Sequence, residues 1–76
     1  MLHLVDSDQP KNHTLSDTHL SVLQLIANGS TIDEISLSKG LSSITIGIYI
    51  SSCVEKLNAK SVANAVNLAR RNYYIR

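Results

Sequence analysis

The chain has 76 residues, of which 43% are hydrophobic and 17% charged, with a formal net charge of +1. This length allows one small domain, because so short a chain buries only roughly 60% of its unfolded surface. The charge excludes a strongly basic nucleic-acid binder, for which a pI above ~9 is the usual signature. The single cysteine excludes an internal disulfide, and without a long apolar run we expect a cytoplasmic protein with no membrane segment.

Residues 1–14 differ in composition from the rest of the chain. They are polar, contain the only proline and show no helical periodicity, so we expect a flexible tail or the remnant of a linker. One folded domain is expected to cover 15–76. His3 and His13 lie in the tail, and no spacing of Cys and His residues resembles a metal site, so we expect no metal or other cofactor.

Two capped segments predict the first two helices. Ser16 is a favourable N-cap for a helix over about 16–28, which an Asn-Gly pair ends. Thr31 and Glu34 can form a capping box for a short helix over about 31–39. The apolar face of the first helix comprises Leu20, Val22, Leu23, Leu25, Ile26 and Ala27, and the expected inner residues of the second are Ile32, Ile35 and Ser36.

The segment 43–57 is ambiguous by local pattern. Ser42 and Ser43 offer hydroxyl caps for a helix. Isoleucines at alternate positions are typical of a strand, whereas a helix needs apolar residues spaced by three or four. The alternating set is Ile44, Ile46, Ile48 and Ile50, and the helical face is Ile46, Ile50, Cys53, Val54 and Leu57. The local pattern leaves both structures open.

A last helix is expected over about 61–72. Ser61 can cap it, and two arginines in its final turn complement the helix dipole. With 43–57 taken as a helix, the fold class is all-α, with four short helices joined by tight turns. The last helix has one face of Val62, Ala65, Val66 and Ala69, and its two arginines are Arg70 and Arg71.

Three ordered segments carry a family resemblance. The first segment comprises Leu15-Ser16 and Val22-Leu23-Gln24-Leu25-Ile26-Ala27-Asn28-Gly29. The second comprises Glu34-Ile35-Ser36 and Gly40-Leu41-Ser42. The third comprises Thr45-Ile46, Lys56-Leu57, Ser61 and Ala65-Val66. In order and spacing, these resemble the L-T-x-R-E-x-x-V-L-x-L-I-A-x-G, E-I-A-x-x-L-G-I-S, T-V, K-L and S positions of the LuxR/GerE family of bacterial transcription regulators. The resemblance covers roughly residues 14–75.

The resemblance implies a four-helix helix-turn-helix domain. Segment 43–57 would then be the recognition helix, placed in the major groove of double-stranded DNA. The last helix would form a two-fold homodimer contact, so that two half-sites lie about one helical turn apart. The residues expected at that interface are Ala65, Leu68, Ala69 and Asn72.

Several positions depart from the family pattern outside the recognition helix. The family's R-E pair is Thr18-His19 here, and we expect His19 to lie in solvent on the outer side of the first helix. The leucine of E-I-A-x-x-L is Lys39, and we expect Leu37 to replace its core contact. Cys53 stands at an apolar core position and is expected to be buried and inert.

The recognition helix itself lacks the expected cations. The resemblance assigns base reading to the positions of Gly47, Ile48 and Ser51, and the family's usual histidine is Tyr49. Arginine–guanine pairs, worth ~1–3 kcal/mol of discrimination each, are unavailable from these positions. Tyr49 can reach a phosphate or pack on the tail or the first helix. The expected DNA-contacting residues are Ser42, Ser43, Thr45, Gly47, Ile48, Ser51, Ser52 and Lys56, with Lys60 as a further phosphate ligand and with capping as the alternative role of Ser42 and Ser43.

Two functions follow from this sequence. The first is a DNA-binding transcription regulator that binds as a dimer. The second is a domain impaired in DNA binding that acts through a protein partner, as a decoy or heterodimer partner, with Ile44 and Ile48 facing outward as the contact. Those two side chains could instead touch thymine methyls. No nucleophile–base pair, paired catalytic carboxylates or phosphate-binding glycine loop is present in the sequence, so an enzyme is not expected.

Overall fold

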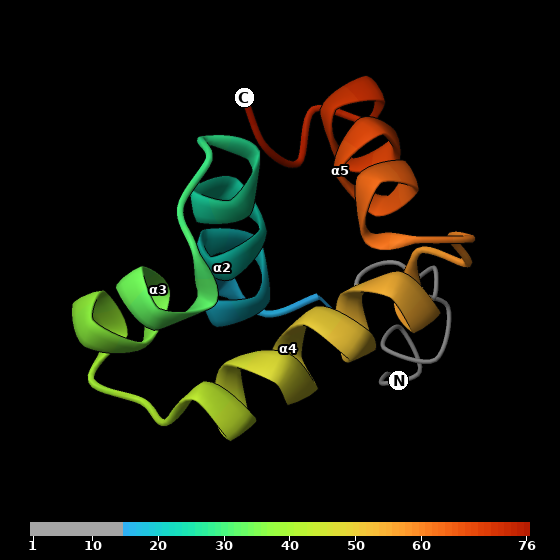
Figure 1. Ribbon diagram of the computed structural model, residues 1–76. Coiled ribbons are helices and arrows are strands. Elements are labelled where there is room, and N and C mark those ends of the chain that lie inside the picture. The colour runs from blue at the N-terminus through green and yellow to red at the C-terminus, as the bar shows by residue number, and fades with distance from the viewer. Residues whose placement is uncertain (1–14) are drawn as a thin grey trace, which may run out of the picture.

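The computed structural model describes residues 15–76; the expected tail, with His3 and His13, lies outside the described residues. The described part of the chain forms four helices and no strand (Figure 1). This confirms the all-α fold class. The helices are α2 (Asp17–Ala27), α3 (Ile32–Lys39), α4 (Ser43–Lys56) and α5 (Val62–Arg71).

Each helix begins immediately after a hydroxyl residue. The N-caps are Ser16, Thr31, Ser42 and Ser61, and each side chain accepts a hydrogen bond from the backbone N–H three residues later. These bonds satisfy donors that a helix leaves unpaired at its start, and each such cap is worth about 1 kcal/mol. All four predicted caps are therefore confirmed, including the Thr31–Glu34 capping box.

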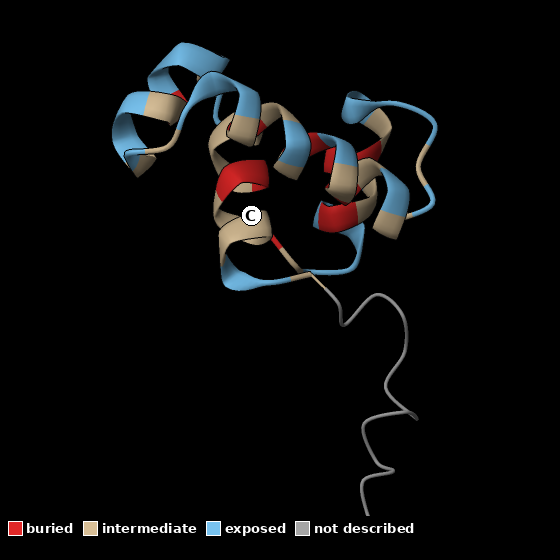
Figure 2. Cartoon of the chain, turned by 90° about the horizontal axis from the view of Figure 1, so that it is seen from below, coloured by how far each residue is buried: buried red, intermediate tan, exposed pale blue. Residues whose placement is uncertain are grey.

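Helix α2 separates two core clusters. Adjacent residues on a helix point about 100° apart, so Val22 faces one cluster and Leu23 the other. Figure 2 shows the buried positions as short segments on the facing sides of the helices. The first cluster joins α2 to α3 and α4 through Val22, Ile35, Ile46 and Ile50. The second joins α2 to α4, α5 and the C-terminal segment through Leu23, Cys53, Val66, Ala69 and Ile75.

The turn between α3 and α4 sets the angle between these helices. It consists of Gly40, Leu41 and Ser42, and Gly40 has φ of 68°, in the left-handed region where a Cβ is unfavourable. The chain bends by 107° between the two helices. Two helices at about 90–120° joined by a three- or four-residue turn define a helix-turn-helix. Within residues 15–76 no single helix is long and apolar enough to cross a bilayer. The bent α3–α4 pair is long and apolar enough together, judged by length and composition alone.

Three expectations about buried side chains are wrong. Leu37 is 85% exposed, so it does not replace the missing leucine at position 39. Lys39 instead keeps its charge out of the core and donates from Nζ to the Ser21 hydroxyl of α2. Ile32 and Val62, each at the first position of its helix, are also exposed rather than inward.

The C-terminal segment packs back on α2, which the sequence did not indicate. Ile75 is buried in the second cluster. The Arg76 backbone N–H donates to Gln24 Oε1 at 2.7 Å, and Gln24 Nε2 donates to the Arg76 carbonyl at 3.2 Å. Arg70 adds donations to the carbonyls of Arg76 and Ala27. The end of the chain therefore links α5 to the end of α2 remote from the Ser16 cap.

Candidate nucleic-acid interface

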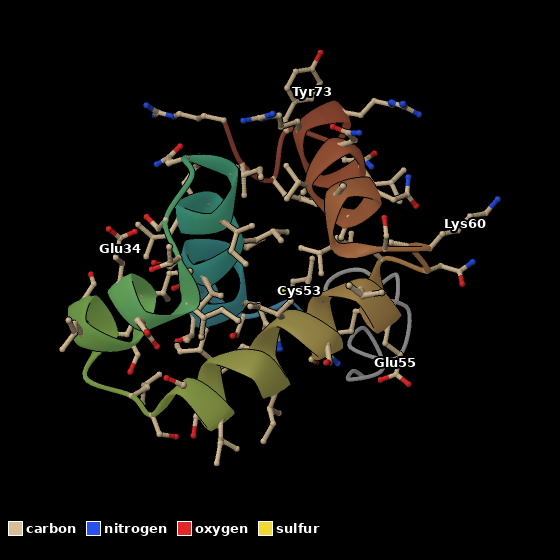
Figure 3. All side chains as sticks on the ribbon, viewed as in Figure 1. Glu34, Cys53, Glu55, Lys60 and Tyr73 are labelled. Carbon is tan, nitrogen blue, oxygen red and sulfur yellow. The ribbon has the colours of Figure 1, made fainter. Side chains whose placement is uncertain are left out.

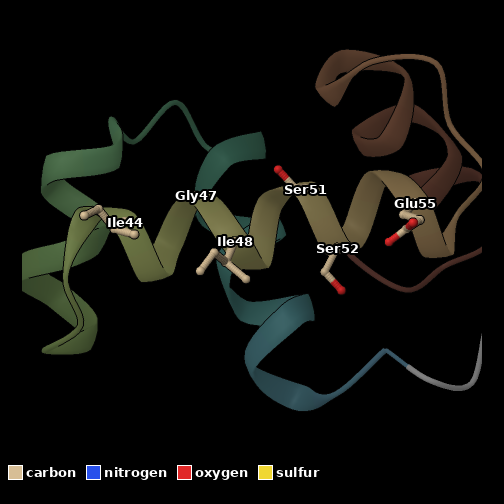
Figure 4. A pocket seen from close by; sticks show the side chains of 6 residues that line it. All are labelled: Ile44, Gly47, Ile48, Ser51, Ser52 and Glu55. Atoms are coloured by element: carbon tan, nitrogen blue, oxygen red, sulfur yellow. The ribbon is translucent and has the colours of Figure 1, made fainter.

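One face of helix α4 is covered by no other element of residues 15–76. Six residues of α4 line a shallow, open pocket on this face (Figure 4): Ile44, Gly47, Ile48, Ser51, Ser52 and Glu55. All six belong to one helix, so the pocket is the outer surface of α4 rather than a cleft between elements. The opposite side of the helix carries Ile46, Ile50 and Cys53 into the core. We refer to these six lining residues as the outer face of α4.

Hydroxyls at the start of α4 are engaged within the protein. The Ser42 hydroxyl accepts from the Thr45 N–H at 3.1 Å and donates to Thr45 Oγ1 at 3.0 Å. The Ser43 hydroxyl donates to Asp33 Oδ1 on α3 at 3.3 Å. Each serine has one hydrogen to donate, so Ser42 and Ser43 would have to give up these bonds to donate to a phosphate. The expected capping role of Ser42 is confirmed.

The three expected base-reading positions lie on the outward side of α4. Ile48 is 64% exposed, Ser51 is exposed and Gly47 is half-buried. A Cβ added at Gly47 meets no heavy atom within 4 Å. The Ser51 hydroxyl has no hydrogen-bond partner among the described residues and points away from the helix axis (Figure 4). The outer face therefore offers aliphatic surface and one free hydroxyl at its centre.

His19 links α2 to α4, contrary to the expectation that it lies in solvent. Its Nδ1 accepts from the Ser16 N–H at 3.2 Å, so it fills the capping-box position where the family pattern has glutamate. With Nδ1 accepting, the ring hydrogen is on Nε2, which donates to the Ser52 hydroxyl of α4 at 3.1 Å. The ring also packs edge-on against Tyr49 at 5.0 Å between centroids. Ser52 and Tyr49 are therefore engaged with α2. The alternative in which Tyr49 packs on the first helix is confirmed, whereas no pattern in the sequence indicated the bond between His19 and Ser52.

Protonation of His19 should weaken the folded state. Burial, and secondarily the positive charge of Lys56, lower its pKa from the ordinary 6.5. The unfolded chain then takes up the proton first, so we expect the free energy of unfolding to fall below about pH 6.5 and level off once the folded pKa is passed. In His19→Gln this loss should be reduced. Urea titrations from pH 8 to pH 5 measure it, and His3 and His13, present in both proteins, cancel in the difference. Identical pH profiles would contradict the prediction.

Cys53 is a core residue, as expected. It is fully buried among α2, α4 and α5, and its Sγ donates to the His19 carbonyl at 3.6 Å. Burial raises the pKa of the thiol to about 11, so the reactive thiolate is scarce at neutral pH. Figure 3 shows Cys53 turned into the body, in contrast to Glu55, Lys60 and Tyr73, which extend away from it.

The charged groups of this region lie at the C-terminal end of the outer face. Lys56 is in the last turn of α4 and Lys60 is exposed in the following turn. Glu55 belongs to the face itself and adds a negative charge. A surface in contact with phosphates normally carries cations. The phosphate-binding capacity of this interface therefore lies at the C-terminal end of α4.

The expected dimer surface on α5 is only partly accessible. Ala65 and Ala69 are fully buried within this chain, and Ala69 belongs to the second core cluster. They leave no surface for a second chain, so these two residues cannot form the expected interface. Leu68 is half-buried and Asn72 exposed. Of the four expected residues, these two remain available to a partner.

Comparison with known proteins agrees with this geometry. The family model described as "Bacterial regulatory proteins, luxR family" matches residues 13–69. BvgA of Bordetella pertussis, named a positive transcription regulator of virulence factors, is 39% identical over 66 residues, which are 87% of this chain and 32% of that protein. The Escherichia coli K12 DNA-binding transcriptional activator EvgA is 35% identical over 66 residues, with the same coverage of both chains.

A Pseudomonas aeruginosa protein named as a transcriptional regulator is 39% identical over 70 residues, which are 92% of this chain and 34% of that protein. This chain thus spans about a third of the length of these relatives. The family match covers three of the four helices completely and most of α5. The helix-turn-helix geometry agrees with the family match, which shows that this chain belongs to the luxR family of bacterial regulatory proteins.

Proposed function

We propose that residues 15–76 form the DNA-binding domain of a transcription regulator. The observation that carries the proposal is the helix-turn-helix of α3 and α4 in a chain of the luxR family, with an outer face of α4 that no other described element covers. In such domains the second helix enters the major groove and its N-terminal residues meet base edges. Here that helix is α4, which begins at Ser43.

Phosphate contacts in this proposal are few. Lys56 and Lys60 are the cations nearest the C-terminal end of α4, and neither has an ion pair among the described residues. Lys39 is already bonded to Ser21. Dimerisation would double the contacts, and we place its surface on the accessible Leu68 and Asn72 of α5. A sedimentation experiment that finds only monomer at high protein concentration would remove the dimer from the proposal.

A salt series with mixed-sequence duplex DNA tests DNA binding. We expect measurable affinity at ~50 mM salt that falls as salt rises, because each neutralised phosphate contributes ~0.9 to the slope of log affinity against log salt. Lys56→Gln should lower this slope by ~0.9 per protomer. Arg76→Gln is the control. It removes the same charge from a residue that is bonded to the end of α2 remote from α4, so it should leave the slope unchanged. Absence of binding at low salt would contradict the proposal.

A second candidate is a protein-binding role. It is favoured by one observation: Ile44 and Ile48 are 78% and 64% exposed, and the six residues that line this face include the acidic Glu55 and no cation. Exposed branched aliphatic side chains that lie together suit a protein contact. The same salt series separates the candidates, because a domain that binds only protein shows no salt-dependent affinity for the duplex.

A further inference from the structure

The outer face of α4 has a definite spacing of its apolar groups. Ile44 is the second residue of α4 and Ile48 lies one turn later on the same side, where both side chains are exposed (Figure 4). At 1.5 Å rise per residue, four residues separate them by about 6 Å along the helix axis. Base pairs stack at about 3.4 Å. The two isoleucines are therefore spaced to meet groups about two base pairs apart.

The major groove offers one apolar group to such side chains. Adenine, guanine and cytosine present hydrogen-bond donors or acceptors there, whereas thymine adds its C5 methyl. Guanine presents only acceptors, N7 and O6, and reading it requires a donor. Neither isoleucine can donate, and the Glu55 carboxylate is acceptor-only when ionised. The Ser51 hydroxyl, which has no partner among the described residues, is a side-chain donor on this face, and the neighbouring Ser52 hydroxyl accepts from His19 and keeps its own hydrogen.

We propose that the outer face of α4 selects thymine-rich half-sites, with Ile44 and Ile48 each packed against a thymine methyl and the two methyls about two base pairs apart. This inference rests on the proposed DNA-binding function and names the class of DNA sequence that the domain would bind. The specificity comes from apolar contact, in place of the arginine–guanine pair that this helix lacks, and guanine meets no donor at the two isoleucine positions. Glu55, beyond the isoleucines, can accept only from base amino groups, on cytosine or adenine.

Removing one methyl group measures one such contact. Burial of one methyl or methylene group raises the affinity about fourfold. Uracil pairs with adenine as thymine does and lacks only the C5 methyl, so replacing thymine by uracil leaves the hydrogen bonds and the charge of the duplex unchanged. Each contacted thymine should therefore show about a fourfold loss on replacement, and the non-contacted thymines none.

The test begins with selection from random-sequence duplex by the full chain, followed by single thymine-to-uracil replacements in the selected site. We expect two sensitive thymines per half-site. In Ile48→Ala one of them should become insensitive, which couples that methyl to this side chain. Leu37→Ala, which removes an exposed aliphatic side chain from α3, is the control and should keep both sensitive positions.

Two failures can be told apart. A selected duplex that is bound equally well with thymine or uracil at every position, or a selected site rich in guanine at the centre of each half-site, overturns the inference while the DNA-binding function stands. Failure to bind any duplex at low salt overturns the proposed function itself. Uracil sensitivity that persists unchanged in both Ile44→Ala and Ile48→Ala would assign the methyl contacts to other residues and also overturn the inference.

Discussion

Ile46→Ala is expected to lower the free energy of unfolding by about 2–5 kcal/mol. Ile46 is fully buried and joins α4 to α2 and α3 through contacts with Val22, Ile35 and Ile50. The substitution removes apolar contact and leaves a cavity in a cluster of only four buried residues. A domain of this size has roughly 4–11 kcal/mol of stability in total, so the loss is a large part of it.

The matched control lies two residues away on the same helix. Ile48→Ala makes the same chemical change at a side chain that is 64% exposed, and alanine favours helix more than isoleucine does. We expect a change within about 0.5 kcal/mol. Urea unfolding followed by circular dichroism measures both, through a shift of midpoint at constant slope. Equal losses at the two positions would mean that α4 does not turn Ile46 inward and Ile48 outward.

This pair of positions also shows where prediction from sequence ended. Alternating isoleucines would all lie on one face of a strand, but on α4 they separate into a buried pair, Ile46 and Ile50, and an exposed pair, Ile44 and Ile48. Local β propensity is weak compared with burial, and the apolar Val22 and Ile35 on neighbouring helices need a partner surface. The family resemblance predicted this helix, whereas local propensity could not.

The helix ends were the most predictable part of the fold, because their signals are local. A hydroxyl three residues before a backbone N–H needs no tertiary context to cap it, and all four predicted caps are present. Contacts between helices were not predictable in the same way. His19 meets Ser52 across 33 positions of sequence, and Leu37 is exposed because α3 turns it away from both clusters. Neither fact has a local pattern.

The sequence predicted the DNA-contacting residues without distinguishing among them. In the structure, some of these residues are accessible to DNA and others are bonded within the protein. Ser42 and Ser43 are bonded within the protein and Ser52 is bonded to His19, whereas Gly47, Ile48 and Ser51 remain accessible on the outer face. On α5, Ala65 and Ala69 are buried within the chain, so they are not accessible for the expected dimer contact. An apolar periodicity identifies the inner face of a helix, but it does not show whether a small residue there meets its own chain or a partner.

Gly47→Arg is expected to raise both stability and DNA affinity. Glycine inside a helix is ~1 kcal/mol less favourable than alanine, and arginine is close to alanine in helix propensity. Outside the local helix backbone no heavy atom lies within 4 Å of an added Cβ, so the side chain starts in open space. The new guanidinium stands at one of the three positions to which the family resemblance assigns base reading. It can neutralise a phosphate, which adds ~0.9 per protomer to the salt slope, or bind guanine with ~1–3 kcal/mol of discrimination.

Gly47→Ala separates these two effects. It should gain the same ~1 kcal/mol of stability and leave the salt slope and the selected sequence unchanged, because it adds no charge and no donor. Thermal or urea unfolding measures the first effect, and the salt series with the selected duplex measures the second. If the arginine and alanine variants bind DNA equally, position 47 does not face DNA, and α4 does not enter the groove by its outer face. If only the arginine variant binds, the fold still presents α4 to DNA, and what the native chain lacks is the cation at position 47.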